Sequence, residues 1–235
     1  MKQIKLLFLL LSIFSTVCSA KDLDLMNLEE LKTELVQRAS NYTGLGDPDF
    51  KIQNELEPLV KRILEVNPQV PVKDRLPLLY GVWKQVWGPY DYQGNDRGVD
   101  PSIEPKEIYQ VIDPDGFYYN VSPSYKNGDR KKERINYLKG QYRLSSKNPN
   151  GLDVKFRKFP GMKKRPDVRP IYDFVKEAED GTLPNQITIV PTFIVRLFFG
   201  GGTLVEVYTD SNLRILYGSN DDEFKNKYLY VMVRQ

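Results

Sequence analysis

Residues 203–217, TLVEVYTDSNLRILY, decide the fold, because they hold two short apolar runs joined by a polar turn. β-Branched and aromatic side chains favour strands, and Asp-Ser-Asn favours a turn. Such a short connection indicates that residues 203–209 and 213–217 pair as an antiparallel hairpin. After the turn residues 218–221, the run 228–234 predicts a further strand.

The strand pattern continues toward the N-terminus. Leu152, Val154 and Phe156 alternate with charged residues, as in a strand with one buried face. Further predicted strands span residues 79–88, 107–112, 116–121, 135–146 and 187–199, and residues 200–202 predict a turn. Short strands joined by short turns indicate an antiparallel meander that closes as a β-barrel.

The first part of the mature chain has helical periodicity. Asn27 and Glu30 have the spacing of a capping box, and an apolar stripe follows them. A second stripe predicts a helix that ends before Asn67 and Pro68. We expect both stripes to pack on a core. The predicted fold is α+β, with a helical region at residues 21–70 and a barrel at residues 71–235.

Residues 1–20 have the features of a signal peptide. Lys2 and Lys5 precede an apolar run of about a dozen residues, too short to span a bilayer, and small residues stand before Lys21. We therefore expect an exported protein, periplasmic or secreted. Removing this segment leaves 32 basic and 31 acidic residues, so charge gives no case for nucleic acid binding.

The residue inventory limits the chemistry. Histidine is absent, and Cys18, the single cysteine, lies in the signal peptide. Catalytic arrangements built on histidine and the usual structural zinc sites are therefore excluded. The acidic pair at 113–115 and the three acidic residues at 221–223 have the composition of turns. Residues 200–202 lack the Gly-Lys-Ser/Thr of a phosphate-binding loop. We expect a non-catalytic protein without metal or cofactor.

Three stretches suggest partners instead. The basic run 130–134 is typical of a solvated loop, with peripheral contact to anionic lipid as the alternative. Residues 90–105 and 159–170 predict long loops rich in charge, glycine and proline. These two loops support an alternative function, a secreted protein-interaction module.

Two segments resemble the plastid lipid-associated protein (fibrillin) family. The first contains residues 56–60, Asn67-Pro68 and Leu79-Tyr80-Gly81-Val82-Trp83. The second contains Tyr208-Thr209-Asp210-Ser211-Asn212-Leu213-Arg214-Ile215 and residues 230–234, which end in Arg234. The resemblance implies a lipocalin-like barrel that associates with lipids or other hydrophobic molecules. The secretory N-terminus departs from the plastid transit peptides of that family. An exported chain without disulfides and without histidine fits a bacterial protein better than a eukaryotic extracellular domain.

Several residues receive roles on this basis. Trp83, after Gly81, is expected to plug the closed end of the barrel beneath Arg234 or Arg214. Asp210 and Arg214 are expected to pair and fix the last hairpin, and Tyr208 belongs to the same motif. The residues expected to line the barrel interior, around a ligand or a packed core, are Trp83, Phe117, Tyr119, Tyr142, Phe156, Phe193 and Val195. The expected ligand is a lipid or another hydrophobic small molecule.

Overall fold

The computed structural model describes residues 22–43, 47, 49–88, 103–105, 108–126, 129–158, 163–164, 201–219 and 227–235. After a 3₁₀ turn, η1 (Leu23–Leu25), the helices are α2 (Leu28–Asn41), α3 (Lys51–Val66) and α4 (Val72–Leu79). The first five strands are β1 (Gly81–Trp87), β2 (Ile103–Pro105), β3 (Tyr109–Ile112), β4 (Phe117–Lys126) and β5 (Asp129–Leu144). The others are β6 (Gly151–Lys158), β7 (Lys163–Lys164), β8 (Gly201–Thr209), β9 (Leu213–Ser219) and β10 (Tyr228–Arg234).

Eight of these strands form a closed antiparallel barrel. Their order is β4-β3-β1-β10-β9-β8-β6-β5, and β5 pairs with β4 to close the ring. The short strands β2 and β7 extend the sheet beside β4 and β5. The predicted α+β fold, with helices before an antiparallel barrel, is confirmed.

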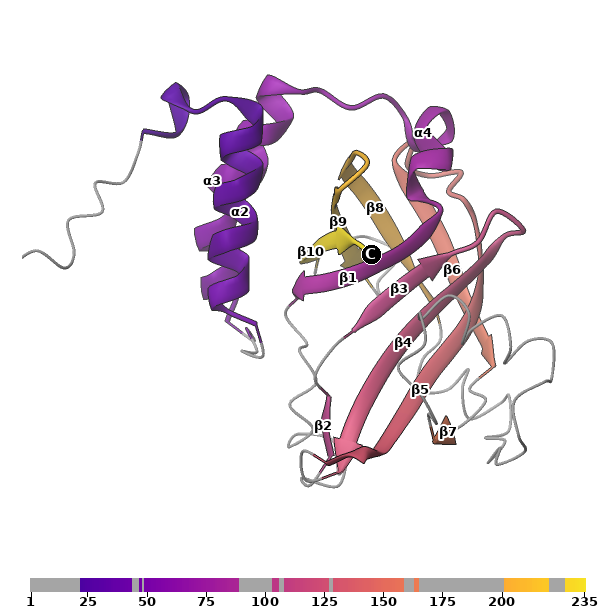
Figure 1. Ribbon diagram of the computed structural model, residues 1–235. Coiled ribbons are helices and arrows are strands. Elements are labelled where there is room, and N and C mark those ends of the chain that lie inside the picture. The colour runs from indigo at the N-terminus through magenta and orange to yellow at the C-terminus, as the bar shows by residue number, and fades with distance from the viewer. Residues whose placement is uncertain are drawn as a thin grey trace, which may run out of the picture.

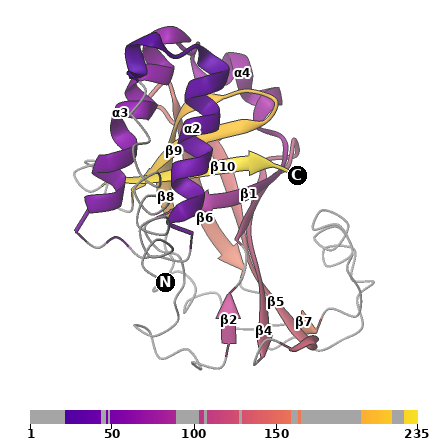
Figure 2. The ribbon, with the colours of Figure 1, turned by 60° about the vertical axis from the view of Figure 1, so that its left-hand side comes forward.

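Helices α2 and α3 lie side by side against the outside of β9 and β10 (Figures 1 and 2). The predicted capping box begins α2, since the Asn27 side chain accepts from the Glu30 amide at 3.0 Å and the Glu30 carboxylate accepts from the Asn27 amide at 2.9 Å. Leu56 and Ile63 of the α3 stripe are fully buried. Both faces of β9 are therefore buried, one under the helices and one inside the barrel.

Helix α4 lies over one end of the barrel, which we call the α4 end (Figure 1). Val72 and Leu79 are buried there against Ile112, Tyr118 and Leu152. This helix was not predicted, because it is only two turns long and contains Pro77. It falls in the region assigned to the barrel by sequence.

Three other expectations need correction. Gly201 and Gly202 pair with Lys155 and Val154 inside β8, so they do not form a turn. The basic run 130–134 lies in β5, where strand pairing with β4 replaces the expected loop. Part of the expected 90–105 loop forms β2.

Some expectations lie outside the described residues: the signal peptide, the strand 187–199, the turn residue 200, the acidic residues 221–223 and most of the two long loops. None of the helices in the described part of the chain combines the length and the apolar character needed to cross a membrane.

Candidate functional site

Contacts fix which side chains face the barrel interior. Leu213 and Ile215 pack under the helices, so Arg214 faces inward. Arg214, on β9, donates a hydrogen bond to Gln110 on β3. Because β9 and β3 are not neighbours in the sheet, this bond must cross the barrel interior. From these positions each barrel strand alternates between an inner and an outer face, except where a β-bulge shifts the register, as between Glu206 and Tyr208.

The α4 end of the barrel is closed around Trp83, which is fully buried. Its indole N–H donates to the Leu79 carbonyl at 2.8 Å. The Arg234 guanidinium carbon lies 4.2 Å from the centre of the indole ring. The same guanidinium donates to the carbonyls of Ser211, Tyr80 and Leu78. The prediction of an arginine over Trp83 is confirmed for Arg234. The hydrogen bonds of Arg234 also connect the residues before β1 to the turn between β8 and β9.

A buried ion pair lies next to this plug. Arg214 donates to both carboxylate oxygens of Glu206, at 2.9 and 2.6 Å, and both side chains are fully buried. Burial alone would lower the pKa of Arg214, but the adjacent Glu206 carboxylate outweighs burial and raises it above its ordinary value. The predicted pairing of Arg214 with Asp210 is therefore wrong, since Asp210 lies in the turn, outside the interior.

Helix α4 adds a second arginine beside this ion pair. Arg75 is buried and donates to the Thr209 hydroxyl at 2.8 Å, to the Val70 carbonyl at 3.0 Å and to the Glu206 carbonyl. Burial lowers the pKa of Arg75 below its ordinary value. These bonds join α4 to β8, so the α4 end is a filled, hydrogen-bonded layer.

The interior becomes more accessible away from α4. On four strands, a buried inward side chain is followed, two residues further from α4, by one that is partly exposed. The buried members are Tyr118, Val154, Glu206 and Met232. We name the partly exposed members the distal layer: Asn120, Phe156, Leu204 and Tyr230.

The backbone of three glycines lies close to the aromatic rings of the distal layer. A Cβ atom added to Gly218 would come within 3.0 Å of the Tyr230 ring, and one added to Gly88 within 2.7 Å. A Cβ atom at Gly140 would lie 3.1 Å from the Phe156 ring. The absence of side chains at these glycines lets both rings lie against the barrel wall.

The ligand candidates divide between the two faces. Trp83, Tyr142 and Phe156 are on the inner face, as predicted, and Phe156 meets Tyr118 edge to face at 6.0 Å. Phe117 and Tyr119 were placed there wrongly. They flank the inward Tyr118, and the Lys139 ammonium lies over the Phe117 ring at 4.0 Å.

The two faces could not be distinguished by hydrophobicity because Tyr118 and Tyr119 are both buried. Phe193 and Val195 lie outside the described residues. Of the distal layer, Asn120, Leu204 and Tyr230 were missed. Counting alternate residues from Trp83 across the predicted strand pairs is the signal that would have found them.

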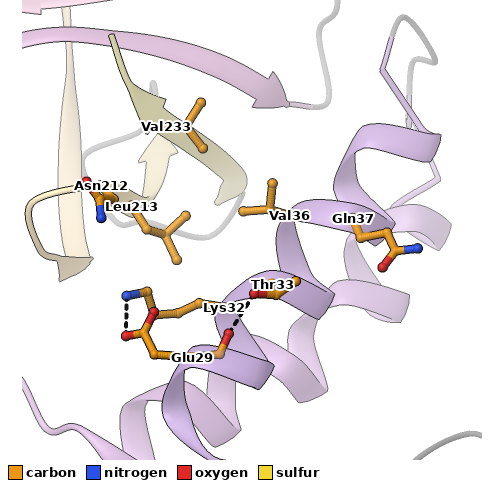
Figure 3. Close-up of a pocket in the computed structure, with 8 residues that line it drawn as sticks. All are labelled: Glu29, Lys32, Thr33, Val36, Gln37, Asn212, Leu213 and Val233. Carbon is orange, nitrogen blue, oxygen red and sulfur yellow. Dashed lines mark hydrogen bonds and ion pairs between the residues drawn. The ribbon is translucent and has the colours of Figure 1, made fainter.

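The seam between α2 and the barrel contains a shallow groove of about 360 Å³. Its lining residues are Glu29, Lys32, Thr33, Val36, Gln37, Asn212, Leu213 and Val233 (Figure 3). Lys32 pairs with both Glu29 and Asp210 at 2.7 Å. Burial alone would lower the pKa of Lys32, but these hydrogen bonds outweigh burial and raise it.

Asp210 completes this tie between helix and barrel. Burial favours its neutral form, yet hydrogen bonds from Lys32, from the amides of Asn212 and Leu213 and from the Tyr208 hydroxyl lower its pKa. Burial and the hydrogen bond to Asp210 raise the pKa of Tyr208 to about 12. The groove's charges are thus engaged in holding α2 on the barrel.

The acidic stretch 113–116 forms the β3–β4 turn, as predicted. Gly116 donates to the Asp113 carbonyl at 3.2 Å with a positive φ of 87°, and the Asp115 amide donates to the Asp113 carboxylate at 2.8 Å. Within the described ranges, no three carboxylate side chains come together as a metal site.

No protein-family model matches the chain. No curated protein matches it either.

Proposed function

We propose that this protein is an exported, non-catalytic binding protein that holds a lipid or another hydrophobic small molecule inside its barrel. The observation that carries the proposal is the gradient of packing along the interior. The α4 end is filled by Trp83, Arg214 and Glu206, whereas the distal layer exposes the aromatic side chains Phe156 and Tyr230.

An eight-stranded barrel has room for one small ligand or for packed side chains. A barrel with only a structural role would gain from filling its interior along its whole length, because buried apolar area stabilises it. Here the filled layer serves as a floor. The aromatic rings above it lie against glycine backbone, and an apolar ligand in this proposal packs against their inward faces.

The resemblance to plastid lipid-associated proteins supports the same function. Its motif residues Gly81, Trp83 and Arg234 form the plug, and Tyr208, Asp210 and Arg214 fix the last hairpin. Membership of that family and the exported location remain parts of this proposal, the latter resting on residues 1–20.

The first test is lipid extraction from natively purified protein followed by mass spectrometry, together with titration of an apolar fluorescent probe. We expect a co-purifying hydrophobic molecule and saturable probe binding. Phe156→Ala should weaken probe binding, because it removes an apolar contact of the distal layer.

Lys155→Ala is the matched control, since Lys155 is the neighbouring residue on the exposed outer face of β6. Binding should be unchanged in this variant. A protein that carries no lipid and shows no saturable probe binding would contradict the proposal. Equal losses in both variants would place the ligand elsewhere.

A further inference from the structure

One polar atom in the distal layer has no hydrogen-bond partner. The side-chain oxygen of Asn120, Oδ1, is buried and accepts no hydrogen bond. Asn120 lies on the inner face of β4, two residues beyond Tyr118, and pairs across the sheet with Gln110. A buried acceptor without a donor destabilises a protein, so its presence here needs an explanation.

The neighbouring polar groups do not supply that donor. The Gln110 side-chain oxygen accepts from Arg214 at 2.7 Å, and this bond fixes the orientation of the Gln110 amide. Arg214 is further held by both oxygens of Glu206. The polar groups of the filled layer therefore bond among themselves, and none of them donates to the Asn120 oxygen.

The Asn120 residue itself is partly exposed, unlike its buried oxygen. Rotation about the Cβ–Cγ bond of asparagine is soft, so the amide can turn its oxygen toward a molecule in the barrel. Apolar binding sites typically use a few placed polar groups to orient a ligand. Asn120 has the position and the unused acceptor for such a role.

We infer that the ligand is an amphipathic molecule whose hydroxyl or amide N–H donates to Asn120 Oδ1, while its apolar part contacts Phe156 and Tyr230. This inference rests on the proposed function and specifies the chemistry of its ligand. A pure hydrocarbon, or a lipid whose only polar groups are ethers or esters, would leave the acceptor unpaired.

The test compares 1-dodecanol with its methyl ether, in which a methyl group replaces the donor hydrogen, by displacement of a bound apolar fluorescent probe. The wild-type protein should prefer the alcohol by roughly tenfold, the order expected for a hydrogen bond to a buried acceptor. Asn120→Leu should abolish this preference while the ether still binds. Asn54→Leu, at an exposed position of α3, is the control and should keep the preference.

A second measurement separates ligand binding from a structural role. Because no protein group donates to this acceptor, Asn120→Leu should leave the urea midpoint unchanged or raise it. A clear loss of stability would show that Asn120 serves the fold through an internal water, and would overturn the inference. Equal binding of alcohol and ether would overturn it too, with the proposed function intact. Binding of neither probe would contradict both.

Discussion

The buried pair of Glu206 and Arg214 gives the sharpest prediction about stability. Glu206→Gln keeps the size of the side chain but removes its charge, so the Arg214 cation stays in the barrel interior without a counter-ion. One of the two oxygens that accept from Arg214, at 2.6 and 2.9 Å, also becomes an amide nitrogen, which can only donate. Breaking a buried pair in this way costs about 3–5 kcal/mol.

That cost is a large share of the roughly 5–15 kcal/mol that stabilises a typical domain. The assay is equilibrium unfolding in urea followed by tryptophan fluorescence, because Trp83 and Trp87 are both buried. Replacing both Glu206 and Arg214 by methionine should cost less than Glu206→Gln alone, since no unpaired charge remains.

The partly exposed pair of Arg38 and Glu34 on α2 provides the control, since its ions meet at a similar distance of 2.7 Å. Arg38→Met should change the unfolding free energy by less than about 1 kcal/mol. The reasoning would be refuted if Glu206→Gln lowered the unfolding free energy as little as Arg38→Met does. It would also be refuted if the double methionine variant lost as much unfolding free energy as its two single substitutions added together.

Three further predictions concern the parts around the plug. Asp210→Asn should lower stability by about 1 kcal/mol near neutral pH. Because the pKa of Asp210 is below its ordinary 3.8, the difference from wild type should persist as pH falls to that value and vanish at still lower pH, as measured by urea unfolding at several pH values. Gly81→Ala should cost about 1–3 kcal/mol in the same assay, since φ is 117° and the new Cβ would lie 2.9 Å from Arg234; an unchanged midpoint would contradict this. Arg234→Lys should cost about 1 kcal/mol and alter the Trp83 fluorescence spectrum, because lysine cannot stack flat on the indole; an unaltered spectrum would argue against the stacked geometry.

Local signals in the sequence predicted much of the fold. The capping box of Asn27 and Glu30 depends on residues three positions apart, and the stripe of α3 on one helical period, so both are visible without tertiary contacts. The barrel followed from short alternating strands and tight turns. Trp83 and Arg234 lie far apart in the chain, and only the family resemblance predicted their contact.

What the sequence could not supply depends on tertiary packing. The alternation of β4 does not reveal its inner face, because Tyr118 packs inside the barrel while Tyr119 is buried on the outer face. The partner of Arg214 was predicted wrongly because it depends on the pairing register of β8 with β9, which the sequence does not reveal. A bulge between Glu206 and Tyr208 changes the pairing with β9, so that Glu206 faces inward and Asp210 remains in the turn with Lys32.

The location of the ligand is the central claim, and photo-crosslinking tests it most directly. A diazirine carried on an alkyl chain would be bound, activated by light and mapped by tandem mass spectrometry of the digested protein. We predict that the label is found on distal-layer residues such as Phe156 and Tyr230, with competition by unlabelled ligand. Label concentrated on the outer face, at Lys155, or in the α2 groove, at Val36, would contradict binding inside the barrel.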